Sequence, residues 1–236
     1  MKHASIVLCH YSKIDDFGQA RAGINPPKRS SLLRKCVQSI LNNTNYPAEL
    51  IVMDNGGNPD DSNYLLKKAR EGKLTHVRFP QNMHYAFAWN TGAKMATGHY
   101  LCFMCNDIEV AKNWLNQCVR ILEEHSKEKI IAIPLITRDK RRLTTILQNG
   151  DRLNPRAGSS CLVIKRKDFY TIGQWPHHTL GGSMWYNKLA NLGYKFIAPP
   201  ADLVQDMGWK RGLNLRIPIQ VKKTLLDGSE IHFEEK

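Results

Sequence analysis

Short apolar runs alternate along much of the chain with segments in which apolar residues recur every three or four positions. The runs are typical of strands buried on both faces, and the longer period is typical of amphipathic helices. The clearest helix is expected at residues 31–41, where one apolar stripe follows Ser30 or Ser31 as N-cap. The same criteria predict strands at 5–9, 49–53, 74–79, 100–105, 130–134 and 160–165, and further helices at 61–71, 86–96, 113–125 and 182–192.

This alternation predicts an α/β fold with a mainly parallel central sheet flanked by helices. The last part of the chain has a different pattern, because apolar and polar residues alternate in places after residue 213. It contains Leu226-Asp227-Gly228-Ser229, which is typical of a hairpin turn. Residues 213–236 are therefore expected to form a small C-terminal β extension.

The composition is that of a folded chain with a surplus of positive charge. A length of 236 residues with 42% hydrophobic content fits one α/β domain with a small appendage. The 34 Lys and Arg against 21 Asp and Glu give a formal net charge of +13. This positive charge favours an anionic partner. The three candidates are a nucleotide-activated substrate, an anionic membrane face and nucleic acid. Ordinary solubilising charge is the alternative.

No run of about twenty apolar residues is present, so no membrane-spanning segment is predicted. The N-terminus lacks the basic and then apolar pattern of a signal peptide. Most of the six cysteines lie in apolar runs, and Cys102 and Cys105 have no second pair at zinc-finger spacing. We therefore expect reduced core thiols in a cytoplasmic protein, which can still contact a membrane peripherally.

The apolar run Tyr100–Cys105 stops at an acidic pair, Asp107 and Glu109. These carboxylates fall at the carboxyl end of a predicted strand, where open α/β sheets bind their ligands. A carboxylate there can hold a divalent cation against the phosphates of a nucleotide. The alternative is that Asp107 caps the helix that begins a few residues later.

Three blocks in a fixed order carry a resemblance to a known family. The second predicted strand ends in Asp54-Asn55-Gly56-Gly57, the next block runs from Asn82 to Gly92, and the third is the strand into Asn106-Asp107. This order resembles family 2 glycosyltransferases, which have the GT-A fold. The resemblance implies a GT-A domain at 1–212, with a nucleotide-sugar-binding half at 1–110 and an acceptor half at 111–212.

The resemblance also implies roles on the donor side. Asp54 matches an aspartate that contacts the base or ribose, and Asn82 and Asn90 match asparagines that line the nucleotide, with Asn106 expected beside them. The alternative for Asp54 is simple turn chemistry, and for the two matched asparagines it is a polar place in a loop or on a helix surface.

A metal site is implied next to the nucleotide. Asp107 matches the acidic residue that binds Mn²⁺ or Mg²⁺ on the diphosphate, and Glu109 can assist through water. Asp206 falls where the family often has a histidine that completes the metal site, and a carboxylate can replace it as an oxygen ligand. The alternative for Asp206 is a loop aspartate paired with Lys210 or Arg211.

The chain departs from the family in two places. His84 stands where the family block has glycine, and the acidic residue expected as base in the acceptor half is missing. An inverting transfer needs a general base near the acceptor hydroxyl. His177, His178, Asp151 and Asp206 are the alternatives, and a retaining mechanism, which needs no such base, also stays open.

The expected function is metal-dependent transfer of a sugar from a UDP-, GDP- or dTDP-sugar to a hydroxyl acceptor. The acceptor is a saccharide, free or lipid-linked, or a hydroxylated DNA base, which the positive charge would suit. Trp175, Trp185 and Trp209 are expected either to stack on sugar or base or to be core residues. A catalytically inactive protein of this fold that binds nucleic acid or a protein partner is the alternative function.

Overall fold

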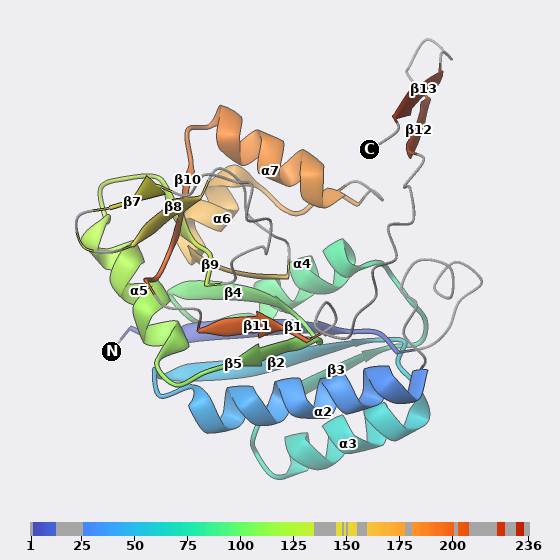
Figure 1. Cartoon of the computed structure of the whole chain (residues 1–236). Helices are drawn as coiled ribbons and strands as arrows, with labels where there is room; N and C mark the ends of the chain where they lie inside the picture. The colour runs from blue at the N-terminus through green and yellow to red at the C-terminus, as the bar shows by residue number, and fades with distance from the viewer. Residues whose placement is uncertain are drawn as a thin grey trace.

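A mixed β-sheet forms the centre of the molecule, and helices cover both of its faces (Figure 1). The computed structural model describes residues 2–12, 26–134, 145–147, 149, 151–154, 160–177, 181–200, 203–207, 221–224 and 230–233. Within these residues nine strands join in one sheet, in the order β3-β2-β1-β4-β9-β6-β10-β8-β7.

The first half of the sheet is parallel, as the sequence predicts. Its strands are β1 (Ala4–His10), β2 (Ala48–Asn55), β3 (Thr75–Phe79) and β4 (Tyr100–Cys105). They are connected through α2 (Pro26–Asn43), α3 (Pro59–Arg70) and α4 (Tyr85–Met95). The chain moves outwards from β1 to β3 and then crosses to the other side of β1 to form β4.

Local chemistry fixes the start of α3. The Asn58 side chain accepts a hydrogen bond from the backbone N–H of Asp61, and Pro59 occupies the first helical turn. Acidic residues lie in the first turn and basic residues in the last, which favours the helix dipole. These signals place the preceding turn, and with it the end of β2, in a fixed position.

The second half of the sheet is mixed. β9 (Cys161–Lys165) runs antiparallel to both β4 and β6 (Ile130–Ala132), while β10 (Lys195–Ala198) is parallel to β6. The edge is completed by β8 (Arg152–Asn154) and β7 (Thr145–Ile146). The helices of this half are α5 (Trp114–Glu124), α6 (Arg166–Ile172) and α7 (Gly181–Asn191).

Two short ribbons complete the described structure. β5 (Ile108–Val110) follows β4 after a two-residue turn and pairs with β11 (Val204–Asp206). β12 (Val221–Thr224) pairs antiparallel with β13 (Glu230–Phe233), which is the β structure expected in the C-terminal extension.

The core has two parts, one on each face of the sheet. Apolar residues of α2, α5 and Leu65 of α3 pack on one face, and those of α4, α6 and α7 pack on the other. Gly92 brings α4 close to β1, since a Cβ added there would lie 2.3 Å from Val7 Cγ1. In the part of the chain that the structure describes, no helix has the length and apolar character needed to span a bilayer.

Candidate functional site

The order of the first four strands creates a natural binding position. β1 lies between β2 and β4, and the connections on its two sides run over opposite faces of the sheet. In open α/β sheets, ligands bind beyond the carboxyl ends of the strands at such a reversal. The position corresponds to the turn after β4 and the last residue of β1.

Polar side chains form a line across this edge of the sheet. His10 at the end of β1 is in register with Asp54 of β2, and Asp54 is in register with Arg78 of β3. On the other side, Cys9 pairs with Cys105, so the next residue after β4, Asn106, lies beside His10. The Asn106 amide nitrogen is 2.8 Å from His10 Nδ1.

Asp54 is completely buried and held by several donors. Its Oδ1 accepts from the Gly57 N–H at 2.7 Å, and its Oδ2 accepts from Ser62 Oγ at 2.5 Å. His76 Nε2 lies 3.3 Å and Arg78 Nη1 3.7 Å from the same Oδ2. Burial acts to raise the pKa of Asp54, but the hydrogen bonds from His76, Ser62 and Gly57 outweigh it and lower the pKa below the ordinary value. Asp54 is at the predicted edge, but it already has partners for both oxygens.

The turn after β4 places the predicted metal residues. Asn106 and Asp107 form this turn, and β11 lies directly against the strand that follows, with Asp206 in register with Ile108. The Met207 N–H donates to the Asp107 carbonyl at 2.8 Å. The backbone thus brings Asp107 and Asp206 to neighbouring positions, as the sequence interpretation requires.

Glu109 has a different position in the same ribbon. It lies between the buried residues Ile108 and Val110 and is itself exposed, opposite Gln205. Successive side chains of a strand point to opposite faces, so Glu109 points away from the core that holds its neighbours.

The donor set fits a metal that arrives with a diphosphate. Among the described side chains, no group of three or more His, Cys, Asp or Glu residues is arranged to hold a metal ion by itself. Nucleotide sites commonly hold Mg²⁺ through one or two carboxylates together with the substrate phosphates. Asp107 lies in the turn after β4, and the main chain of Asp206 lies on the neighbouring strand, which is consistent with a site of this kind.

Asn82 organises the loop before α4. Its Oδ1 accepts hydrogen bonds from Asn55 Nδ2 and from the His84 N–H, both at 2.9 Å. Asn55 Oδ1 in turn accepts from the Met83 N–H at 2.8 Å. Gly56 is required in this contact, because it has φ +78° and a Cβ there would lie 2.6 Å from the Gln81 carbonyl carbon.

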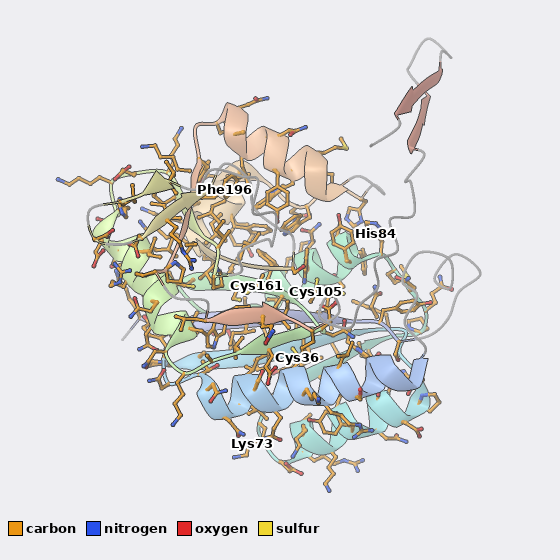
Figure 2. All side chains as sticks on the ribbon, in the orientation of Figure 1. Cys36, Lys73, His84, Cys105, Cys161 and Phe196 are labelled. Carbon is orange, nitrogen blue, oxygen red and sulfur yellow. The ribbon has the colours of Figure 1, made fainter. Side chains whose placement is uncertain are left out.

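His84 is the helix cap at the end of this loop. It has φ 70° and ψ 144°, and its Nδ1 accepts from the Ala86 N–H at 3.4 Å. Figure 2 shows His84 at the start of α4 and Cys105 in the middle of the view, at the end of β4. The positive φ explains why the family has glycine at this position, because a residue with a side chain adopts this φ only at a cost in free energy.

Asn90 lies in the core, away from the exposed edge of the site. Its Nδ2 donates to the Trp175 carbonyl at 2.9 Å, and its Oδ1 accepts from the Trp175 N–H at 3.0 Å. The side chain is 4% exposed. This corrects the expectation of a nucleotide contact, because both ends of the amide are used to hold the segment between α6 and α7.

The predicted base at Asp151 is also corrected. Asp151 is buried beside β8, four positions from β4 in the strand order, where Arg120 Nη2 lies 2.6 Å from its Oδ1. Asn149 donates to its other oxygen at 2.8 Å. Asp151 therefore stabilises the far edge of the sheet. His177 is exposed, with its ring 5.8 Å from that of Phe87 on α4, and His178 lies outside the described residues.

The aromatic residues expected to meet a sugar are core residues where they are described. Trp175 and Trp185 stack on each other with ring centroids 4.1 Å apart and are 1% and 0% exposed. Trp209 lies outside the described residues. The pair instead fills the space between α4 and α7.

Sequence reasoning missed His10 as a site residue. It is fully buried, and its Nε2 lies 3.1 Å from Asp61 Oδ2 at the start of α3. The available signal was its position directly after the apolar run 5–9, at the carboxyl end of a predicted strand.

Comparison with known proteins identifies the family of the chain. The model of the family described as glycosyl transferase family 2 matches residues 28–191. O-antigen biosynthesis protein RfbC of Myxococcus xanthus is 32% identical over 93 residues, which are 39% of this chain and 7% of that protein. Minor teichoic acid biosynthesis protein GgaB of Bacillus subtilis is 25% identical over 158 residues, 63% of this chain and 15% of that protein. The chain thus spans only a small part of these relatives.

Solved structures share the fold. A mannosyltransferase from Pyrobaculum calidifontis, PcManGT, in complex with GDP-Man and Mn²⁺, aligns with a TM-score of 0.65 and 19% identity over 89% of this chain and 58% of its own. GalNAc-T7 with UDP, GalNAc and Mn²⁺ aligns with a TM-score of 0.64 and 19% identity, over 86% and 42%. The predicted GT-A fold is confirmed.

Proposed function

Because the chain belongs to glycosyl transferase family 2, we propose that it transfers a sugar from a nucleotide-sugar donor to a hydroxyl acceptor, with a divalent metal at Asp107. The observation that carries this proposal is the position of Asp107. It lies in the turn after β4, at the reversal of strand order, where a diphosphate would meet the sheet.

The metal site would use Asp107 and Asp206. When bound, Mn²⁺ or Mg²⁺ would neutralise the charge that develops on the leaving diphosphate. Asp107 is the second residue after β4, and Asp206 pairs with Ile108 next to it, so backbone hydrogen bonds hold the main chain of the two residues close together. Glu109, which is exposed on the same ribbon, would have a smaller effect.

The nucleotide would lie across the ends of β2 and β3. Arg78 is 41% exposed and its guanidinium is held near Asp54, so it is placed to meet an anionic or base group. Asp54 would contact the nucleotide directly if it gave up its most distant partner, Arg78. Otherwise it would act indirectly, by holding the Arg78 side chain in position for the nucleotide. Asn82 would act by shaping the loop that covers the site.

A saccharide of a cell-surface polymer is the acceptor class that we favour. The two relatives described above are named for O-antigen and teichoic acid biosynthesis. UDP- and GDP-sugars are the donors to test first, because UDP and GDP-Man occupy the two solved structures of the same fold. DNA binding has one observation in its favour, the net charge of +13.

Donor hydrolysis and transfer to saccharide acceptors should be measured over a panel of UDP- and GDP-sugars, with and without Mn²⁺. We expect Asp107→Asn to lower the rate at least 100-fold, because the metal loses a charged ligand. Glu109→Gln is the matched control and should retain more than about a third of the rate, since this side chain is exposed and assists at most through water.

Two results would overturn the proposal. One is an inactive panel under every condition for a folded protein, which would favour a binding protein without catalysis. The other is equal rates for wild type and Asp107→Asn. Duplex DNA binding that falls steeply with salt, with no response to saccharides, would instead favour the DNA acceptor.

A further inference from the structure

His10 connects two parts of the site that are far apart in the sequence. Its Nε2 lies 3.1 Å from Asp61 Oδ2 on α3, and its Nδ1 lies 2.8 Å from Asn106 Nδ2 in the turn after β4. The imidazole and the Asp61 carboxylate are both completely buried. Asn58 Nδ2 also donates to Asp61 Oδ2, at 3.0 Å.

The donors and acceptors define a direction for this chain of hydrogen bonds. The amide nitrogen of Asn106 can only donate, so His10 Nδ1 accepts. The proton of the ring is then on Nε2, where it is donated to the Asp61 carboxylate. A carboxylate that accepts a hydrogen bond from one ring nitrogen fixes the tautomer and the orientation of the ring.

Gly57 lies close to one side of the imidazole. A Cβ added there would lie 3.0 Å from His10 Nε2 and 2.6 Å from Asp54 Oδ1. Real Cβ atoms almost never show the 2.6 Å approach to Asp54, and 3.0 Å to His10 is already tight, which explains the glycine at this position. The two hydrogen bonds of the ring and this close contact favour one orientation of the imidazole between β2 and β4.

We propose that His10 is a positioning residue that fixes the Asn106–Asp107 turn through its Nδ1. This inference rests on the proposed function for the metal role of Asp107. Asn106 and Asp107 are the only residues between β4 and β5, so a side chain that holds one of them restricts the other. The rigid unit that orients Asp107 thereby extends to the start of α3.

A pair of substitutions separates the two hydrogen bonds of the ring. Asn places an amide oxygen near the position of Nδ1, so His10→Asn retains an acceptor for Asn106. Gln places an amide nitrogen near Nε2, so His10→Gln retains the donor to Asp61 and loses the acceptor. Both variants remove the ring, which makes each a control for the other. Asn106→Ala is a third variant in the turn itself.

Binding of UDP and of GDP should be measured by calorimetry as a function of Mn²⁺, together with the NMR signals of the Asn106 side-chain amide. We expect His10→Gln and Asn106→Ala to raise the Mn²⁺ concentration for half-maximal nucleotide binding at least tenfold. His10→Asn should stay within about threefold of wild type. The double variant His10→Gln with Asn106→Ala should be no worse than Asn106→Ala alone.

The NMR measurement separates failure of this inference from failure of the proposed function. Asn106 amide signals that change in His10→Gln and persist in His10→Asn support the positioning role, with or without nucleotide binding. Unchanged signals in both variants would overturn it. Equal metal-dependent nucleotide binding by wild type and His10→Gln would also overturn the positioning role. If the wild type binds neither UDP nor GDP, only the proposed function is refuted.

Discussion

At the scale of single residues, His84 shows how this chain departs from its family and at what cost. Its φ of 70° with ψ of 144° belongs to a region that is almost restricted to glycine. The family has glycine there, and this chain has a histidine whose ring lies 4.4 Å from that of Tyr85. The strain is held by the hydrogen bonds of Asn82 and Asn55 to the same loop.

Replacing His84 by glycine should therefore stabilise the protein. Relief of the strained backbone is worth about 1–3 kcal/mol, and the greater freedom of glycine in the unfolded chain offsets about 0.5–1 kcal/mol. We expect a net gain of about 1 kcal/mol in the free energy of unfolding, measured by urea denaturation. Asn113→Gly is the matched control, because Asn113 has φ 65° but asparagine tolerates this conformation. A loss of stability in His84→Gly would contradict this explanation.

The sequence predicted part of the site, and the limit has a physical reason. The place of Asp107 at the sheet edge could be predicted, because a carboxylate after an apolar run marks a strand end, while its role with a metal stays a prediction. Asp151 was misplaced because nothing local indicates that Arg120, on another element, neutralises it. His10 was missed because its partners, Asp61 and Asn106, are distant in the sequence.

At the scale of elements, Asn90 joins α4 to the segment before α7. The two hydrogen bonds between its amide and the backbone of Trp175 resemble one rung of a β-ladder made by a side chain. Trp175 in turn stacks on Trp185 of α7, so α4 and α7 are held at a fixed distance. This arrangement fixes the segment that carries His177.

Asn90→Ala should destabilise the protein by about 2–3 kcal/mol. The substitution leaves a buried N–H and a buried carbonyl of Trp175 without their partners, and each such group costs about 1–3 kcal/mol before relaxation. Chemical denaturation measures this change. Gln38→Ala, which removes an exposed hydrogen bond to Asn42, should change the free energy by less than about 0.5 kcal/mol. Equal effects of the two substitutions would refute the stabilising role of the hydrogen bonds between Asn90 and the Trp175 backbone.

The elements themselves were predicted with uneven success. The parallel strands and α2 to α5 were predicted because long periodic segments and caps specify them locally. β7, β8 and β10 were missed, since they contain two to four residues and owe their conformation to pairing with distant strands. The antiparallel insertion of β9 could not be read from its own apolar run, which suits either direction.

At the scale of the whole molecule, the burial of the cysteine thiols shows how well the core excludes solvent. All six cysteines are among the described residues, and none is in a disulfide. Cys36, Cys102, Cys118 and Cys161 are completely buried. Burial, with a smaller effect of the Asp54 charge, raises the pKa of Cys9 to about 12, so its reactive thiolate is scarce near neutral pH.

The native protein should therefore expose few thiols to a chromogenic thiol reagent. We expect rapid reaction of at most one cysteine, Cys105; Cys9 is also only partly buried, but its raised pKa should make its reaction slow. The other four should react at a rate that follows global unfolding. Cys105→Ser should remove a rapid phase, and all six should react in denaturant. Rapid reaction of four or more thiols in the native protein would contradict the closed core.

The antiparallel strand β9 has a consequence for how the chain is made. It is the neighbour that covers the outer edge of β4, yet it begins at Cys161, more than fifty residues after β4 ends at Cys105. During synthesis at about 5–20 residues per second, several seconds pass between the two strands. In that interval the parallel half can assemble, but the edge of an apolar strand is open to pairing with another chain. Until β9 is made, this edge of β4 is therefore the place where two nascent copies on neighbouring ribosomes would pair.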